Sequence, residues 1–214
     1  MTKEEIVTDI RQFISNVTFI NDCTSLLKTM ELAKEKYKKE MNLAPTFFGV
    51  TQQALVKIII IETYKIFEVD IDKEDKENVI YSKHTKNIGR FINMMEMHTK
   101  LLQNPLYNGV PIGDEPKELI KTSINEFNEL KHILKKLKHQ RDKIYAHSDG
   151  KYFLYKNQMD LGENNITYGE IEKLTAFASM TLNNFIHYLN EIPQLSMSTN
   201  TDDLLVLLKK TCND

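Results

Sequence analysis

The chain has 214 residues, of which 41% are hydrophobic and 27% charged, and its formal net charge is −2. This composition is typical of a soluble globular protein, and it excludes a collagen-like, a disordered or a disulfide-framework chain. Because the net charge is slightly negative, any contact with nucleic acid has to come from a local basic patch.

The cysteines and the N-terminal residues favour a cytoplasmic protein. Cys23 and Cys212 lie near opposite ends of the chain, without metal spacing, as is usual in a reducing compartment. The opening residues, MTKEEIVTDIRQF, carry acidic groups from the fourth position and resemble no signal peptide. The longest apolar run, ALVKIIIIETYKIF, is too short and too charged to span a bilayer, so we expect no membrane segment.

The apolar pattern predicts helices along almost the whole chain. A first helix is predicted over 3–16, where Thr2 and Glu5 have capping-box spacing, and a second over about 22–41. A third, over about 51–68, is apolar around most of its circumference, which is typical of a helix in the middle of a bundle.

An acidic connection, VDIDKEDKEN, follows the third predicted helix. Its carboxylates suggest a calcium loop, but Asp75 occupies the sixth position, where such a loop needs glycine, and the closing Glu is missing. We therefore expect a solvated linker. A fourth helix is predicted over about 83–103, followed by a loop over 103–116 that holds three of the five prolines.

A fifth helix is predicted from about 116 to 148, with a break in the low 120s, and Gly150 ends it. The residues after it cross back and include KYFLY, which has strand character. Thr167 and Glu170 repeat the capping-box spacing and predict the start of a sixth helix.

That sixth helix is predicted over about 168–190, and a Ser/Thr/Asn-rich spacer then leads to a short amphipathic helix, DDLLVLLKK. The sequence therefore predicts an all-α antiparallel bundle. We expect a single helical domain over 1–192 and an appendage over 193–214, consisting of the spacer and the short helix.

Arg141 interrupts the apolar stripe of the fifth predicted helix. At ~100° per residue, one face about 120° wide collects the apolar residues Phe127, Leu130, Ile133, Leu134, Leu137, Ile144 and Tyr145. Arg141 falls inside this face, and His147 falls at its margin, roughly 120° from Arg141. A charge among apolar residues has to be paired, reach out to solvent, or serve a purpose other than stability.

A purely structural role for Arg141 is the alternative. The guanidinium could form a salt bridge within the helix or to another helix, with Asp142 or Glu129 as candidate partners. Adjacent helical residues do not face each other, so the wheel predicts that Asp142 is a poor partner.

The stretch RDKIYAH, residues 141–147, consists of an Arg, a polar residue, four further residues and a His. It resembles the R-polar-x4-H signature of the HEPN superfamily (higher eukaryote and prokaryote nucleotide-binding domains). The longer string RDKIYAHSDGK, before a TYGEI helix start, is similar to the abortive-infection branch of that superfamily. The resemblance covers most of the chain, and it implies a HEPN-like bundle with additional N-terminal and C-terminal helices.

The resemblance also implies a metal-independent endoribonuclease that works as a homodimer and needs no cofactor. His147 suits proton transfer because an imidazole titrates near neutral pH. Arg141 suits the stabilisation of charge on phosphate oxygens, and the resemblance assigns Asp142 a contribution to activity. The expected products carry 2′,3′-cyclic phosphate ends. Two antiparallel copies of the helix would bring both Arg–His pairs into one cleft.

Several side chains around this motif are candidates for RNA contact. Lysines are frequent between 131 and 143, where Asp142 is the only acid, and a local basic surplus can hold an RNA backbone. The candidates are Lys135, Lys138, Lys143, Tyr145 and Ser148. The alternatives are solubility for the lysines, core packing for Tyr145 and capping of the helix end for Ser148.

Three functions remain open from the sequence. The first is a HEPN ribonuclease that acts as a toxin or an antiphage effector on RNA, with an antitoxin as a possible partner. The second is a non-catalytic HEPN-fold binding module, for instance the partner of a nucleotidyltransferase. The third is a helical interaction protein in which Arg141 and His147 are structural. No Cys/His cluster with metal spacing occurs in the sequence, so we expect no metal site.

Overall fold

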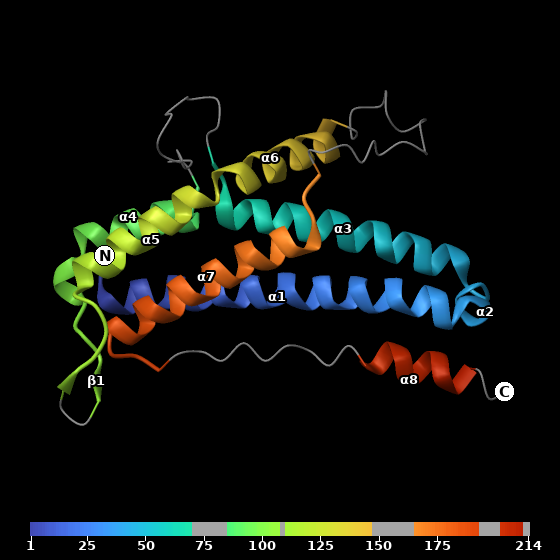
Figure 1. Cartoon of the computed structure of the whole chain (residues 1–214), viewed down its shortest axis with the longest axis horizontal. Helices are drawn as coiled ribbons and strands as arrows, with labels where there is room; N and C mark the ends of the chain where they lie inside the picture. The colour runs from blue at the N-terminus through green and yellow to red at the C-terminus, as the bar shows by residue number, and fades with distance from the viewer. Residues whose placement is uncertain (70–84, 108–109, 147–164, 193–201, 212–214) are drawn as a thin grey trace.

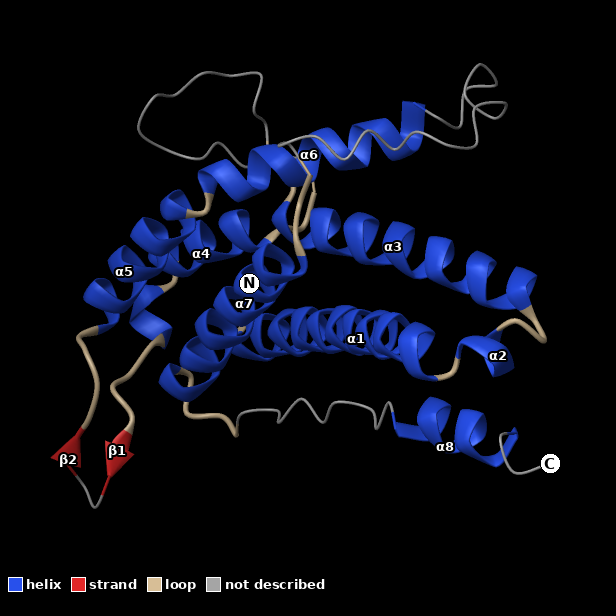
Figure 2. Ribbon diagram, turned by 45° about the vertical axis from the view of Figure 1, so that its right-hand side comes forward, coloured by secondary structure: helices blue, strands red, loops and turns tan. Residues whose placement is uncertain are grey.

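The structure, a computed structural model, describes residues 1–69, 85–107, 110–146, 165–192 and 202–211. The described elements are α1 (Lys3–Lys36), α2 (Lys38–Met41), α3 (Pro45–Phe67), α4 (Ile88–Met97), the 3₁₀ turn η1 (Thr99–Leu101), β1 (Leu106–Tyr107), β2 (Val110–Pro111), α5 (Pro116–Glu129), α6 (Lys131–Ala146), α7 (Tyr168–Tyr188) and α8 (Asp202–Thr211). This is the predicted all-α class (Figure 2). The KYFLY stretch and the acidic connection after residue 69 lie outside the described residues.

Helix α1 is the central helix of the bundle, and α3, α7 and α8 all pack against it (Figure 1). Its predicted capping box is confirmed, because the Thr2 hydroxyl accepts from the Glu5 N–H at 3.3 Å and the Glu5 carboxylate accepts from the Thr2 N–H at 2.7 Å. The predicted division into two helices is wrong, since α1 runs unbroken to Lys36. Val17 and Ile20, in the supposed gap, are 1% and 0% exposed, and their burial overrides their β-branched preference.

Helix α3 begins earlier than predicted, with Pro45 in its first turn, where proline is favourable. Its C-terminal half has one buried face, as expected, formed by Ile59, Ile60, Thr63, Tyr64, Ile66 and Phe67. Its N-terminal half is not, since Gln53, Ala54 and Lys57, within the predicted range, are exposed. The expectation that the whole helix lies inside the bundle therefore holds only for its second half.

Helix α4 is shorter than the helix predicted over 83–103. The Asn87 side chain caps it by accepting the Arg90 N–H at 2.9 Å, and its last turn passes into η1. The predicted loop over 103–116 includes a small antiparallel hairpin, with Leu106 paired to Pro111. Gly113, at φ +82°, lies so close to the Tyr188 hydroxyl that a Cβ would collide with it.

The predicted fifth helix is divided at Leu130 into α5 and α6, later than the expected break in the low 120s. No proline or glycine marks this point. The two halves pack on different neighbours, α5 on α4 and α7 and α6 on α3 (Figure 1). The change of direction lets both apolar faces reach the core, and Leu130 itself is 2% exposed.

One large core joins α1, α3, α4, α5, α6 and α7. A second, smaller cluster forms where α8 packs on the end of α1 and on α2, and its buried members are Ala33, Tyr37, Met41 and Leu208. The capping box of the sixth predicted helix is also confirmed, at Thr167 and Glu170 of α7. Among the helices that the structure describes, none combines the length and apolarity that a bilayer crossing requires.

Candidate active site at the end of helix α6

Helix α6 is held on the bundle by its apolar face. Ile133, Leu134 and Leu137 are 1%, 1% and 0% exposed and belong to the core that α3 and α7 share. Together with Phe127 and Leu130, they account for the first five residues of the predicted stripe. This part of the stripe is therefore used within the chain itself. The side chains of Ile144 and Tyr145 lie outside the described residues.

Two polar contacts tie α6 to the start of α7. The Lys136 ammonium forms an ion pair with the Glu170 carboxylate at 2.7 Å. The Gln140 side-chain oxygen accepts the Ile166 backbone N–H at 3.0 Å. Because Gln140 directly precedes Arg141, the backbone at the start of the motif is anchored on this side.

Arg141 lies between a carboxylate and an aromatic ring. Its Nη1 is 3.1 Å from Oδ1 of Asp142, and its guanidinium carbon is 3.9 Å from the centroid of the Tyr64 ring. The other carboxylate oxygen of Asp142 is 3.6 Å from the ammonium of Lys138, one turn earlier. Asp142 thus bridges two cations. The Arg141 side chain is 25% exposed, so solvent still reaches part of it.

The prediction that Asp142 is a poor partner for Arg141 is wrong. Adjacent Cβ atoms diverge by ~100° on a helix, but the four-bond stem of arginine lets the guanidinium fold back beside its neighbour. The other candidate partner was Glu129, and the contact that the structure gives is to Asp142. Arg141 is therefore paired, as the structural alternative required, and partly exposed, as a catalytic role requires.

Tyr64 comes from α3 and was not predicted from the sequence. Its side chain is 7% exposed, and its hydroxyl donates to the Val69 carbonyl at 3.4 Å. Burial raises the pKa of the Tyr64 phenol, and the neighbouring Arg141 lowers it only in part. The ring therefore stays neutral at physiological pH. In the sequence, Tyr64 is one apolar position in an apolar helix, and no spacing links it to residue 141.

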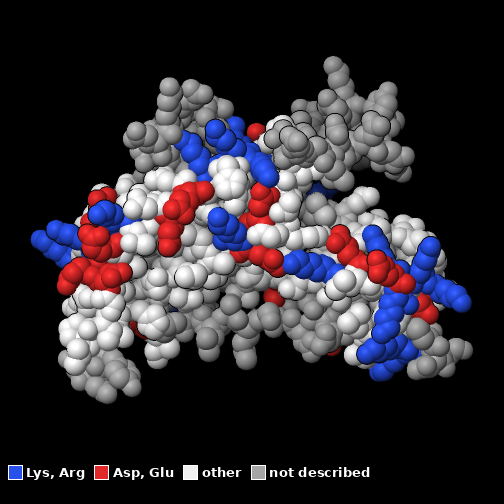
Figure 3. Space-filling view, viewed as in Figure 1, with Lys and Arg blue, Asp and Glu red and all other residues white. Residues whose placement is uncertain are grey.

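Of the predicted RNA-binding residues, Lys135 and Lys138 have side chains that the structure describes. Lys135 is exposed on α6, and Lys138 is engaged with Asp142. Figure 3 shows lysine and arginine side chains gathered over α6. His147 and Ser148 lie outside the described residues, as do the side chains of Lys143 and Tyr145.

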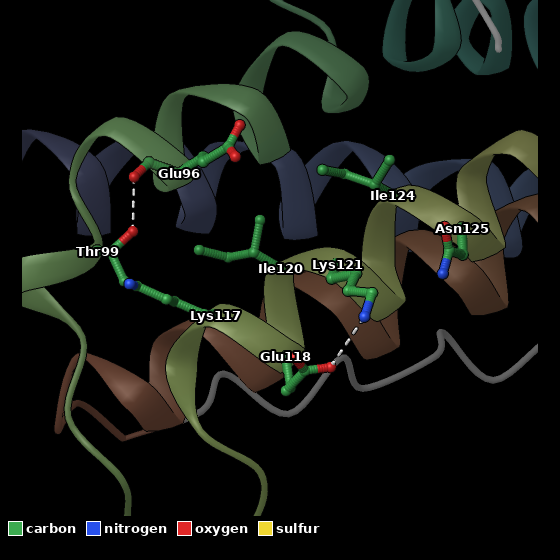
Figure 4. A pocket seen from close by; sticks show the side chains of 8 residues that line it. All are labelled: Glu96, Thr99, Lys117, Glu118, Ile120, Lys121, Ile124 and Asn125. Carbon is green, nitrogen blue, oxygen red and sulfur yellow. Dashed lines mark hydrogen bonds and ion pairs between the residues drawn. The ribbon is translucent and has the colours of Figure 1, made fainter.

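A groove of about 450 Å³ lies away from this site, between α5 and the end of α4 (Figure 4). Its lining residues are Glu96, Thr99, Lys117, Glu118, Ile120, Lys121, Ile124 and Asn125. The charged groups on its rim partly neutralise one another, for example Lys121 with Glu118 at 3.6 Å. The groove contains none of the residues predicted to act on RNA.

Within the described ranges, no three His, Cys, Asp or Glu side chains lie close enough together to hold a metal ion. The residues that the structure does bring together, Arg141, Asp142, Lys138 and Tyr64, offer a positively charged donor group backed by an aromatic face. Such a group can bind a phosphate and stabilise negative charge on its oxygens.

Comparison with known proteins gives one match. The family model HEPN_AbiU2, described as AbiU2, matches residues 4–202, which is nearly the whole chain. No curated protein and no solved structure matches the chain. The matched range includes α6 and the Arg141 motif. The chain therefore belongs to the HEPN_AbiU2 family, in the abortive-infection branch of the HEPN superfamily.

Proposed function

We propose that this protein is a metal-independent endoribonuclease that acts as a toxin or an antiphage abortive-infection effector. The observation that carries the proposal is the state of Arg141 at the end of α6. The guanidinium is held by Asp142 and by the Tyr64 ring, yet remains partly exposed. A partly exposed guanidinium held at two points can meet a phosphate from solvent without first being reoriented.

In this mechanism Arg141 binds the phosphoryl oxygens of the scissile bond and stabilises the charge that builds up on them. His147 transfers the protons, either from the attacking 2′-hydroxyl or to the leaving 5′-oxygen. The 2′-oxygen attacks the adjacent phosphorus and the bond to the 5′-oxygen breaks. The products are a 2′,3′-cyclic phosphate and a 5′-hydroxyl. Asp142 sets the orientation of Arg141, and the exposed Lys135 attracts the RNA backbone.

The active form in this proposal is a homodimer through the motif helix. The first five stripe residues are already covered within the chain, so the contact with a second copy uses the part of the helix beyond Leu137. A two-fold axis there would place the Arg141 of each copy close to the His147 of the other. An antitoxin or a nucleotidyltransferase is the further partner in this proposal.

The deciding experiment is cleavage of cellular and phage RNA in excess EDTA. Wild type is compared with Arg141→Ala, Arg141→Lys and His147→Ala, after all variants are shown to fold and to dimerise equally. His139→Ala is the matched control, because His139 lies on the same helix and is exposed. We expect wild type and His139→Ala to produce cyclic-phosphate ends.

We expect Arg141→Ala and His147→Ala to lose activity by at least about 100-fold, as for removal of a charge-stabilising group or a general acid–base group. Arg141→Lys should recover only part of it, because lysine lacks the planar fork. Equal behaviour of all variants on every RNA would overturn the ribonuclease proposal and favour a non-catalytic HEPN-fold binding module.

A further inference from the structure

The Tyr64 ring lies directly against the guanidinium of Arg141. The two residues are 77 positions apart in the sequence and come from α3 and α6, which pack against each other. The distance of 3.9 Å from the guanidinium carbon to the ring centroid is that of direct contact. A cation over an aromatic face is attracted by the negative face of the ring.

The ring is more firmly fixed than the arginine that it supports. Tyr64 is 7% exposed and its hydroxyl is directed to the Val69 carbonyl, while Ile60 and Phe67 beside it on α3 are 3% and 1% exposed. The ring therefore has little freedom to move. The Arg141 side chain has several rotatable bonds, and its exposed end would otherwise sample several directions.

Asp142 contacts the same guanidinium from its own helix. Its Oδ1 is 3.1 Å from Nη1 of Arg141, and its second oxygen is 3.6 Å from the ammonium of Lys138. The Tyr64 ring, on α3, contacts the guanidinium from a different element, so the two contacts together restrict it more than either contact alone. A defined orientation matters because arginine binds two phosphate oxygens at once through its planar fork.

We propose that Tyr64 is a positioning residue for Arg141: its ring holds the guanidinium in the orientation in which it binds the scissile phosphate. This inference rests on the proposed ribonuclease function. Tyr64 itself touches no substrate, because Arg141 covers its ring. The aromatic face, 3.9 Å from the guanidinium carbon, is the feature on which this proposal rests.

The first measurement is independent of any activity. The Nε–H signal of Arg141, assigned by its disappearance in Arg141→Lys, is shifted by the ring current of an aromatic face in contact with it. We expect the shift to persist in Tyr64→Phe and to vanish in Tyr64→Leu. The same resonance position in all three proteins would overturn the stacking.

The second measurement is RNA cleavage by the same variants. We expect Tyr64→Leu to lower kcat/KM about tenfold, which corresponds to about 1.4 kcal/mol, within the range of a partly desolvated cation–π contact. The loss should fall mainly on kcat, since the plane of the guanidinium matters most where the charge develops. Tyr64→Phe should restore most of the activity because the ring is retained.

Tyr37→Leu is the matched control. Tyr37 is also a buried tyrosine, 5% exposed, with the ammonium of Lys36 5.4 Å from its ring centroid, but it lies at the far end of α1 (Figure 1). It should lose stability without a change in kcat. If Tyr64→Leu behaves like Tyr37→Leu while wild type cleaves RNA, Tyr64 has only a packing role. If wild type itself does not cleave, the ribonuclease proposal fails, and the positioning role fails with it.

Discussion

Lys136 of α6 and Glu170 of α7 form an ion pair at 2.7 Å, and Glu170 is at the same time the acidic member of the α7 capping box. One carboxylate oxygen accepts from Lys136 and the other from the Thr167 N–H. A single side chain therefore caps the beginning of α7 and fastens the motif helix to it.

This double role predicts a pH-dependent stability. Burial by itself raises the pKa of Glu170, but the hydrogen bonds from Lys136 and Thr167 outweigh it and hold the pKa below the ordinary 4.5. A carboxyl group whose pKa is lower in the folded chain contributes fully above its unfolded pKa. The contribution is lost as the pH falls through the folded pKa.

We therefore expect Glu170→Gln to lower the free energy of unfolding by about 1 kcal/mol at pH 7. The difference from wild type should shrink below pH 4.5 and disappear once wild-type Glu170 is itself protonated. Urea unfolding at several pH values measures this. Glu118→Gln is the control, since Glu118 is in an exposed pair with Lys121 and should change stability little. A pH-independent difference would contradict the coupling.

Leu137→Ala tests the use of the α6 stripe within the chain. Leu137 is 0% exposed, and removing a leucine side chain from a packed core costs about 2–5 kcal/mol. Leu32→Ala makes the same change on α1, where the side chain is 75% exposed, and should change stability by less than about 0.5 kcal/mol. Denaturant unfolding decides the matter: similar midpoints for the two variants would mean that α6 is not anchored in the core.

Asp142→Asn separates the binding of RNA from its cleavage. The change removes the negative charge from between Arg141 and Lys138, so both cations attract phosphate more strongly. We expect RNA affinity to rise a few-fold at low salt while kcat falls, because Arg141 loses its ion pair with Asp142. Binding is measured by fluorescence anisotropy at several salt concentrations, and Asp203→Asn on α8 is the control. A parallel fall of both quantities would contradict this role.

Lys135→Ala tests the basic surface on α6. Lys135 is exposed there, so its loss should weaken RNA binding a few-fold and reduce the salt dependence by about one released counterion. Lys209→Ala removes an exposed lysine from α8 and should leave binding unchanged. If the two substitutions weaken RNA binding equally, binding depends on the overall charge of the protein and not on the basic surface of α6.

Leu208→Ala tests the docking of α8. Leu208 is 5% exposed in the small cluster with Ala33, Tyr37 and Met41. Loss of about 2 kcal/mol of apolar burial should raise amide hydrogen exchange in α8 about 30-fold, without a comparable change in α7. Val206→Ala, at a position 46% exposed, is the control. Equal exchange in both variants would mean that Leu208 does not hold the helix.

Much of the fold is a local property of the sequence. The two capping boxes, the all-α class and the existence of α3, α7 and α8 follow from periodicity and from short-range capping chemistry, which act within a few residues. The continuity of α1 and the division at Leu130 were not predictable in this way. Both depend on tertiary packing. Burial of Val17 and Ile20 keeps α1 continuous, and the different packing partners of α5 and α6 explain the division at Leu130.

The candidate site likewise combines residues that could be predicted from local sequence with a contact and a residue that depend on side-chain reach and helix packing. Arg141 and Asp142 are recognisable because they interrupt a stripe and match a motif. Their mutual contact was missed because a wheel represents Cβ directions and not the reach of a long side chain. Tyr64 was missed because its meaning depends on the packing of α3 against α6, and helix packing of that kind leaves no trace in the spacing of a single sequence.

The position of α1 at the centre of the bundle affects how the chain assembles during synthesis. The helix that covers much of its apolar face, α7, begins roughly 130 residues after α1 ends, which at ribosomal rates is a delay on the order of ten seconds. During that time α3 can pack against one side of α1, and α6 can pack against α3. Glu170, which fastens α6, is translated only afterwards. The motif helix is thus fastened only after the first turn of α7 has been made, so the contact that anchors α6 to α7 forms later than the packing of α3 on α1.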